Sequence, residues 1–282
     1  MIGGLSVMPP DEYRLGVLVK TFITTEYTFR SKRIGRQPLK FVMISDLHNV
    51  TFGRNNSLLL EEIQRQKPDA LLIAGDLLTA KPGCPVDVPV NFIQKAVPCC
   101  PVYYALGNHE YRMKIYPETY HHQYETYEKE LKKHGVILLE NNSRTIEIKG
   151  TRITFYGLAL NAKYYTKIRR HKLPLKEMEE MLGKPDQNSY NILLAHNPKF
   201  APEYFAWGAQ LTLSGHYHGG VVRLPFNRGL ISPYFTIFPK YCYGKYTSGN
   251  QHLVVGAGLG EHTIPIRIGN PRELVVIHLV EE

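Results

Sequence analysis

Residues 39–48 read LKFVMISDLH, and this stretch shows the pattern on which the fold prediction rests. An apolar run, Leu39–Ile44, is followed at once by two residues that can bind a metal, Asp46 and His48. A short apolar run bounded by polar turns is typical of a buried strand. Four more runs of this kind occur, and we expect each to be a strand: Ala70–Ala74, Val102–Leu106, Ile192–Ala195 and Leu211–Leu213.

Helices are predicted between the first of these strands, at Ser57–Gln66, Val88–Val97 and Tyr120–His134. The last of them stops at Gly135, a residue type that commonly follows a helix. Alternation of strand and helix indicates an α/β fold with a largely parallel core sheet.

Further strands are expected outside this core. Thr145–Ile148 and Arg152–Tyr156 flank a Lys-Gly pair, which is typical of a hairpin. Gln251–Val255, Glu273–Leu279 and Tyr13–Arg30 also have strand character. This surplus predicts a second sheet packed on the first. We predict one domain over residues 1–282, in which residues 1–35 form an extra N-terminal strand and its lead-in.

The composition is that of an ordinary folded protein. Of 282 residues, 43% are hydrophobic and 21% are charged, which argues against disorder and against a fibrous architecture. Four cysteines without a CxxC pair favour a reducing compartment. No run reaches the roughly 18 apolar residues of a membrane span, and no signal-peptide pattern is recognisable. The prediction is a cytoplasmic protein without a transmembrane segment, with peripheral attachment to a membrane left open.

The formal net charge of +9 suits an acidic partner such as nucleic acid, a phosphorylated metabolite or an anionic membrane surface. Lys and Arg are scattered along the chain, so a generally basic surface explains the charge equally well.

Metal-binding residue types follow all five predicted core strands. A single histidine or a Gly-Asp pair has an ordinary structural explanation as a hydrogen-bonded loop or a turn. Ligands of open α/β sheets bind beyond the carboxyl ends of the strands, where scattered core histidines would have no reason to gather. We therefore expect one metal site, built from Asp46, His48, Asp76, Asn108, His196, His216 and His218.

The chemistry of these side chains narrows the choice of metal. Four imidazoles, two carboxylates and one amide are too rich in nitrogen for Ca²⁺ or Mg²⁺, and the set lacks the thiolates of many structural zinc sites. The set favours two divalent transition-metal ions, Mn, Fe or Zn, that share one ligand. Two such ions outweigh the charge of two carboxylates, so the centre would attract phosphate and acidify a bridging water.

In chain order these residues form the pattern D-x-H, G-D, G-N-H-E, H and G-H-x-H, spread over about residues 39 to 220. The sequence thereby resembles the calcineurin-like metallophosphoesterases. Its ending, with Gly256–Gly260, Pro265, Arg267 and Pro271–Glu273, is similar to that of the YkuE-type branch.

The resemblance implies a metallo-dependent phosphatase-like fold, a four-layer αββα sandwich of two mixed β-sheets flanked by helices. It implies that Asp46, His48 and His218 hold one metal, that Asn108, His196 and His216 hold the other, and that Asp76 bridges the two. By the same resemblance His109 is not a ligand: with Asn108 it contacts the substrate, and it either protonates the leaving oxygen or orients other groups through hydrogen bonds. Asp76 and His109 are the catalytic candidates. Tyr217 and Val221 stand where many relatives carry Thr and Gln. We expect these two differences to change contacts with the substrate and to leave hydrolysis intact.

The predicted function is a dinuclear metallophosphoesterase. A metal-bridging hydroxide would attack a phosphomonoester or phosphodiester in line, and the substrate would be a small molecule or a lipid headgroup. A nuclease is the first alternative, because of the charge, although no nucleic-acid module is recognisable. A catalytically inactive scaffold is the second, but such a protein should have lost ligands and none is missing. The sequence predicts no oligomeric state.

Three further features lie outside this pattern. Residues 234–246 are aromatic and basic and could line a groove for a nucleobase or an acyl chain, although a covered strand pair is the favoured interpretation. Arg112 could contact phosphate or be a surface charge. His262 could approach the site through the Gly-rich turn before it.

Overall fold

Two six-stranded sheets form the centre of the computed structural model, which describes residues 21–166, 171–224, 228–229, 239–261 and 266–282. The strands are β1 Phe22–Arg30, β2 Leu39–Ile44, β3 Ala70–Ala74, β4 Val102–Ala105, β5 Ile137–Leu139, β6 Asn142–Ile148, β7 Thr151–Leu158, β8 Tyr190–Ala195, β9 Leu211–Ser214, β10 Arg223–Leu224, β11 Arg228–Gly229, β12 Gly244–Ser248, β13 Gln251–Val255 and β14 Arg272–Val280. The α-helices are α1 Ser57–Gln66, α2 Asp87–Ala96, α3 Asn108–Ile115, α4 Gln123–Lys133, α5 Leu175–Leu182 and α6 Ala201–Trp207. Short 3-10 turns lie at Arg54–Asn56, Pro117–Tyr120, Ala162–Tyr165 and Pro198–Phe200.

Both sheets are mixed. The first has the order β1-β14-β2-β3-β4-β5, in which β2 to β5 run parallel and β14 is antiparallel to β2. The second has the order β12-β13-β9-β8-β7-β6, in which β13, β9, β8 and β7 run parallel and the two edge strands are antiparallel. Strands β10 and β11 form a separate two-stranded ribbon.

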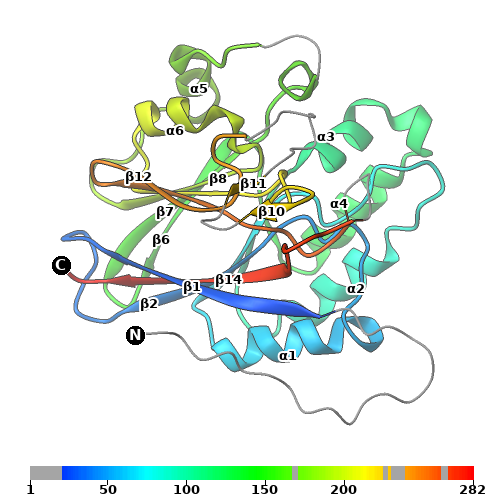
Figure 1. The fold of residues 1–282 in the computed structure, drawn as a ribbon, viewed down its shortest axis with the longest axis horizontal. Coiled ribbons are helices and arrows are strands. Elements are labelled where there is room, and N and C mark those ends of the chain that lie inside the picture. The colour runs from blue at the N-terminus through cyan, green and yellow to red at the C-terminus, as the bar shows by residue number, and fades with distance from the viewer. Residues whose placement is uncertain (1–20, 167–170, 225–227, 230–238, 262–265) are drawn as a thin grey trace.

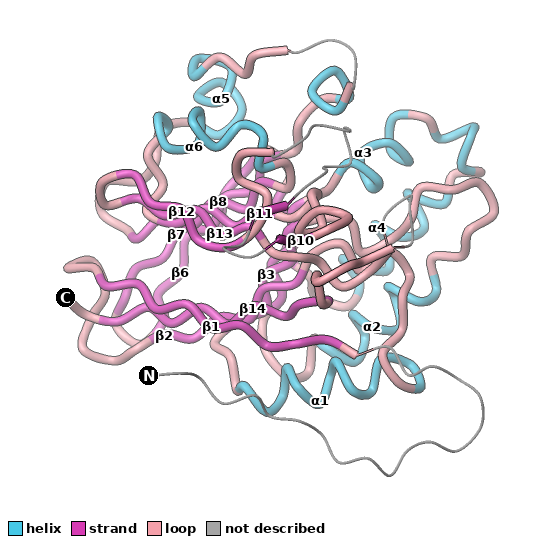
Figure 2. Tube along the Cα trace, in the orientation of Figure 1, coloured by secondary structure: helices cyan, strands magenta, loops and turns pink. Residues whose placement is uncertain are grey.

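The core lies in three layers of side chains around these sheets. Alternate residues of β2 point to opposite faces: Val42 and Ile44 pack under the helices, whereas Phe41 and Met43 pack between the sheets. Strand β8 alternates in the same way on the second sheet, where Leu193 packs on the side of α5 and α6. Figure 1 shows α1 and the pair α5 and α6 at opposite ends of the stack, and Figure 2 shows the strands between them. The predicted four-layer αββα sandwich is confirmed.

Most predicted elements are present with small shifts at their ends. Strands β2, β3 and β13 and helix α1 have the predicted limits. The helix predicted at Tyr120–His134 starts only at Gln123, because His121 and His122 take left-handed conformations with φ of 51° and 55°. The described part of the predicted Tyr13–Arg30 strand is β1, which pairs in parallel with β14 at the edge of the first sheet.

The four cysteines are free thiols, as the sequence suggested. In the described residues, the helices are too short and too polar to cross a bilayer.

Candidate metal centre

The polar residues predicted for the site lie just past the ends of five strands, three from the first sheet and two from the second. Asp46 and His48 follow β2, Asp76 follows β3 and Asn108 begins α3 after β4. From the second sheet, His196 follows β8, and His216 and His218 follow β9. The loops that follow these strands therefore bring side chains from both sheets together in one place.

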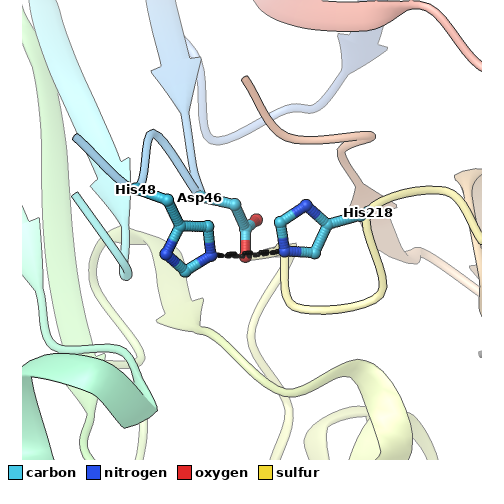
Figure 3. A group of neighbouring side chains, drawn as sticks. All are labelled: Asp46, His48 and His218. Atoms are coloured by element: carbon cyan, nitrogen blue, oxygen red, sulfur yellow. Dashed lines mark hydrogen bonds and ion pairs between the residues drawn. The ribbon is translucent and has the colours of Figure 1, made fainter. Parts of the chain in front are cut away.

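One group of ligand-type atoms consists of Asp46, His48 and His218. The Nε2 atom of His218 lies 3.3 Å from Asp46 Oδ1 and 3.3 Å from Nε2 of His48. Figure 3 shows the two rings with the carboxylate of Asp46 between them. Three potential donor atoms thus converge on one point.

A second group consists of Asp76, His196 and His216, all buried. Nε2 of His196 lies 3.0 Å from Asp76 Oδ2, and the rings of His196 and His216 meet edge to face with centroids 5.0 Å apart. Nε2 of His48, from the first group, lies 3.8 Å from Asp76 Oδ2. Asp76 also forms a third group with His48 and His109, so it links the second group to His48 of the first.

Two of the imidazoles are oriented by backbone carbonyls. Nδ1 of His48 lies 3.3 Å from the oxygen of Leu78, and Nδ1 of His196 lies 2.7 Å from the oxygen of Ala74. A carbonyl accepts a hydrogen bond from Nδ1–H, so the ring proton stays on Nδ1 and the lone pair of Nε2 can bind a metal.

Asn108 is buried, and its side-chain oxygen Oδ1 has no hydrogen-bond partner among the described residues. A buried polar atom without a partner is costly, and a bound cation would satisfy it. Together with the imidazole and carboxylate donors, this orphaned oxygen fits a site for two transition-metal ions.

The backbone at the site is unusual. Five candidate ligands have φ in the left-handed region: Asp46 at 52°, His48 at 48°, Asp76 at 56°, His216 at 68° and His218 at 50°. Residues other than glycine adopt this conformation at a cost and keep it only where the surrounding structure imposes it. Backbone hydrogen bonds between the loops hold this conformation: Asp46 N donates to Gly75 O at 3.0 Å, and His48 N donates to Asp76 O at 3.2 Å.

Gly107 shows how closely the loops approach each other. A Cβ added there would overlap the carboxylate of Asp76 and lie 2.6 Å from its backbone nitrogen. The G-N-H-E motif therefore needs glycine at this position so that Asp76 can occupy the centre of the site.

The buried acidic and basic side chains of the site shift one another's pKa. Burial alone would raise the pKa of Asp76, but the imidazoles of His196 and His109 hold this pKa well below its usual range. Burial alone would lower the pKa of His196, but the carboxylates of Asp76 and Asp46 raise it to about 10. A metal bound at Nε2 of His196 would have to displace the proton that this raised pKa favours.

His109 is the most accessible imidazole of the cluster that contacts Asp76, with a side chain 23% exposed and Nε2 3.9 Å from Asp76 Oδ2. Its Nδ1 accepts a 2.7 Å hydrogen bond from the backbone N–H of Ala80. The proton of the ring is therefore on Nε2, directed toward the site. Burial lowers the pKa of His109 to about 4.

Glu110 holds the loops that carry Asp76 and Asn108. Its Oε2 accepts hydrogen bonds from the backbone N–H groups of Asp76 and Gly107, both 2.9 Å long. Its Oε1 accepts a 2.5 Å hydrogen bond from the hydroxyl of Tyr104. Burial and the Asp76 carboxylate raise the pKa of Glu110 to about 7.

Residues near the C-terminus support the site, and the sequence analysis assigned them no role. The side chain of Asn270 donates to the backbone oxygens of His218 and Gly220, each at 2.5 Å. Glu273 is buried and accepts from Ala257 N at 2.8 Å. Their partners are remote in the sequence and include the side chains of Tyr243 and Arg223, so no spacing in the sequence reveals them.

The remaining candidates have clear positions or lie outside the described residues. Arg112 is exposed on α3, and Tyr217 is buried. His262 and residues 234–238 are not among the described residues; the rest of the aromatic-basic stretch leads into β12, with Cys242 and Tyr243 buried. In this described part, residues 239–243 lie outside any strand and Gly244–Tyr246 belong to β12, an edge strand in which Lys245 is exposed, so the predicted covered strand pair is not found there.

Known proteins resemble this chain over most of its length. The sequence pattern of the family described as calcineurin-like phosphoesterase matches residues 39–220. The Bacillus subtilis protein YpbG is 28% identical over 88% of this chain and 84% of its own length. Two proteins of the same organism named as metallophosphoesterases also match: YkuE, 27% identical over 91% of this chain and 85% of its own, and YkoQ, 24% identical over 85% and 83%.

Proposed function

Because this chain belongs to the calcineurin-like phosphoesterase family and is a hydrolase acting on phosphoric esters, we propose that it works with two divalent transition-metal ions. The proposed ligands are Asp46, His48 and His218 for one ion and Asn108, His196 and His216 for the other, with Asp76 shared. The observation that carries the proposal is the convergence of two groups of donor atoms with Asp76 between them.

When bound, two such ions supply an acidified water as nucleophile and polarise the phosphoryl group. The side chains of the protein fix where this happens. Asp76 keeps its negative charge between the two groups, and the hydrogen bond from His109 N to Asp76 Oδ1, 2.9 Å, holds its carboxylate in place.

His109 is proposed to act on the substrate from the accessible side of the site. Since Ala80 donates to Nδ1, the Nε2–H of His109 is a fixed hydrogen-bond donor toward an incoming phosphoryl oxygen. The same contact disfavours a second proton on the ring, which proton transfer to a leaving group would require. We therefore favour hydrogen bonding by His109 over general acid catalysis.

A small substrate is proposed because the ligand-type side chains are deeply placed. His196 is fully buried, and the side chains of His48 and His218 are only 7% and 6% exposed. A phosphate on a small molecule or a lipid headgroup can enter a site of this depth more easily than one in a nucleic-acid duplex. The net positive charge of the loaded centre suits such an anion.

The test combines metal analysis of the purified chain with a panel of phosphomonoesters, phosphodiesters, nucleotides, lipid phosphates and single-stranded nucleic acid. We expect two transition metals per chain and hydrolysis of small esters, abolished in Asp76→Ala. Asp186→Ala, which removes a carboxylate paired with Arg152 on the surface, is the matched control. One metal with a closed coordination sphere, or turnover unaffected by Asp76→Ala, would overturn the proposal, and cleavage of nucleic acid alone would replace it with a nuclease.

A further inference from the structure

One amide from the C-terminal part of the chain binds the backbone of the loop that carries His218. Asn270 is only 3% exposed. Its Nδ2 donates hydrogen bonds to the backbone oxygens of His218 and Gly220, both at 2.5 Å. Its Oδ1 accepts a short hydrogen bond from Nη2 of Arg223. Each side of the amide therefore faces the type of partner that it needs, which fixes the orientation of the amide.

The loop that Asn270 binds has a backbone conformation that favours glycine. His218, Gly219 and Gly220 are three successive residues in the left-handed region, with φ of 50°, 67° and 82°. Histidine keeps this conformation only where the surrounding structure imposes it. A Cβ added to Gly219 would lie 2.6 Å from both Nη2 of Arg223 and Oδ1 of Asn270, so the loop packs tightly on this pair. The two carbonyls that Asn270 binds lie on either side of Gly219, so one side chain holds the whole turn.

Backbone pairing brings Asn270 to this loop. Val222 and Ile268 form an isolated parallel bridge just past the loop. Two residues after Asn270, β14 begins, and it pairs antiparallel with β2, whose carboxyl end leads to Asp46. Asn270 therefore connects the edge of the first sheet that carries Asp46 with the loop of the second sheet that carries His218.

The amide of Asn270 is itself supported by a chain of buried contacts. Cζ of Arg223 lies 3.4 Å from the centre of the Tyr243 ring, and the hydroxyl of Tyr243 donates to Oε1 of Glu273 at 2.7 Å. Oε2 of Glu273 accepts from the backbone N–H of Ala257 at 2.8 Å. Buried hydrogen bonds of this kind rigidify their surroundings. Asn270 is thus a fixed point from which the loop is held.

We propose that Asn270 is a positioning residue for the metal centre: it fixes the backbone of residues 218–220 and thereby places the imidazole of His218 beside the carboxylate of Asp46. This inference rests on the proposed two-metal function. The family pattern ends at residue 220, so the proposed centre depends on a residue beyond that pattern.

The experiment titrates the metal-free full chain with Mn²⁺ or Zn²⁺ by calorimetry and compares Asn270→Asp and Asn270→Ala with the unaltered chain. The Asp variant keeps the size of the side chain and an acceptor for Arg223 but loses both donors. Loss of a group that orients a metal ligand typically weakens metal binding by about 10–100-fold. We expect a loss of this size for at least one of the two equivalents in both variants. Metal binding like that of the unaltered chain in either variant would overturn the inference, and the Ala variant serves alone if the Asp variant does not fold.

Asn191→Asp is the matched control for general damage to the fold. Asn191 is a buried amide at the start of β8, and its Nδ2 donates to the backbone oxygen of Asp186 at 2.8 Å. It lies at the opposite end of this strand from His196. We expect Asn191→Asp to lower the Tm of the metal-free chain, as Asn270→Asp does, and yet to bind both equivalents with unaltered affinity. Equal weakening of metal binding by the two changes would reject a positioning role.

A double variant tests whether Asn270 acts through His218. In a His218→Ala background, Asn270→Ala should cause little further loss of metal, because the ring that it places is gone. A further loss as large as that caused by Asn270→Ala alone would contradict the inference. Fewer than two metals in the unaltered chain would overturn the proposed function first, and this inference with it, so the two failures are distinguishable.

Discussion

Replacing Glu110 should show how much its hydrogen bonds to the loops of the site contribute to stability when no metal is bound. Glu110→Ala leaves four buried donors without their acceptor: the N–H groups of Asp76, Gly107 and Leu78, the last at 3.4 Å, and the hydroxyl of Tyr104. Each stranded buried donor costs about 1–3 kcal/mol, and a water entering the vacated space recovers part of this. We expect a loss of about 3–5 kcal/mol in the free energy of unfolding, or a fall of about 10 °C in Tm.

Glu110→Gln should cost much less, about 1 kcal/mol. The amide oxygen of the introduced glutamine can still accept hydrogen bonds from the backbone N–H groups of Asp76 and Gly107. Its NH₂ group can donate to the Tyr104 hydroxyl, which can turn its own proton to the Tyr127 hydroxyl 3.1 Å away.

The assay is denaturant unfolding with a chelator present, because a metal that binds only the folded chain would add its own stabilisation. Glu140→Ala is the control, since Glu140 pairs with Lys114 at the surface and its loss should change stability by less than about 1 kcal/mol. If Ala and Gln at position 110 were equally destabilising, the charge of Glu110 would matter rather than its hydrogen bonds, and the reasoning would be refuted.

Three more outcomes are expected. Asp76→Ala should remove both metals, because the shared carboxylate neutralises charge between them, and elemental analysis showing full metal content would contradict this. His109→Ala should keep both metals and slow turnover by about 10²–10³-fold, the loss typical of one positioned hydrogen-bond donor, to a similar extent for esters with good and poor leaving groups; a much smaller loss with aryl phosphates would restore the acid role. Burial alone would raise the pKa of Glu62, but hydrogen bonds from Arg65, Gln66 and Thr24 lower it, so Glu62→Gln should be less stable than the unaltered chain at pH 7. Its deficit, less than about 1 kcal/mol, should shrink as the pH falls below 4.5 and vanish once the pH is below the lowered pKa of folded Glu62, and a deficit that persists at still lower pH would exclude a charge effect.

The sequence was most informative where one local rule decided the structure. The strands β2 and β3 are buried on both faces, so they appear as apolar runs, interrupted in β2 by Lys40 alone, that end where the polar residues begin. Since the candidate ligands follow directly after these runs, both the strands and the place of the site could be predicted. Which side chains share a metal was available only from family resemblance, because nothing in the spacing assigns His218 rather than His216 to Asp46.

The rest depends on contacts between remote residues. Asn270 binds the backbone oxygen of His218, and Arg267 binds that of Gly260, so their roles follow from the folded chain rather than from a motif. Helices α5 and α6 were not predicted, since each is short and is stabilised by packing on the second sheet. The late start of α4 reflects left-handed residues that the apolar pattern does not show.

The left-handed conformation of five candidate ligands also indicates whether selection still maintains the activity of the protein. Each such residue costs about 1 kcal/mol relative to glycine, which adopts this conformation freely. In a lineage that had abandoned hydrolysis, random substitution of these positions by glycine or asparagine would stabilise the fold and meet no opposing selection. An aspartate or histidine at all five positions is what selection for activity would maintain against that drift, and it argues against a retired scaffold.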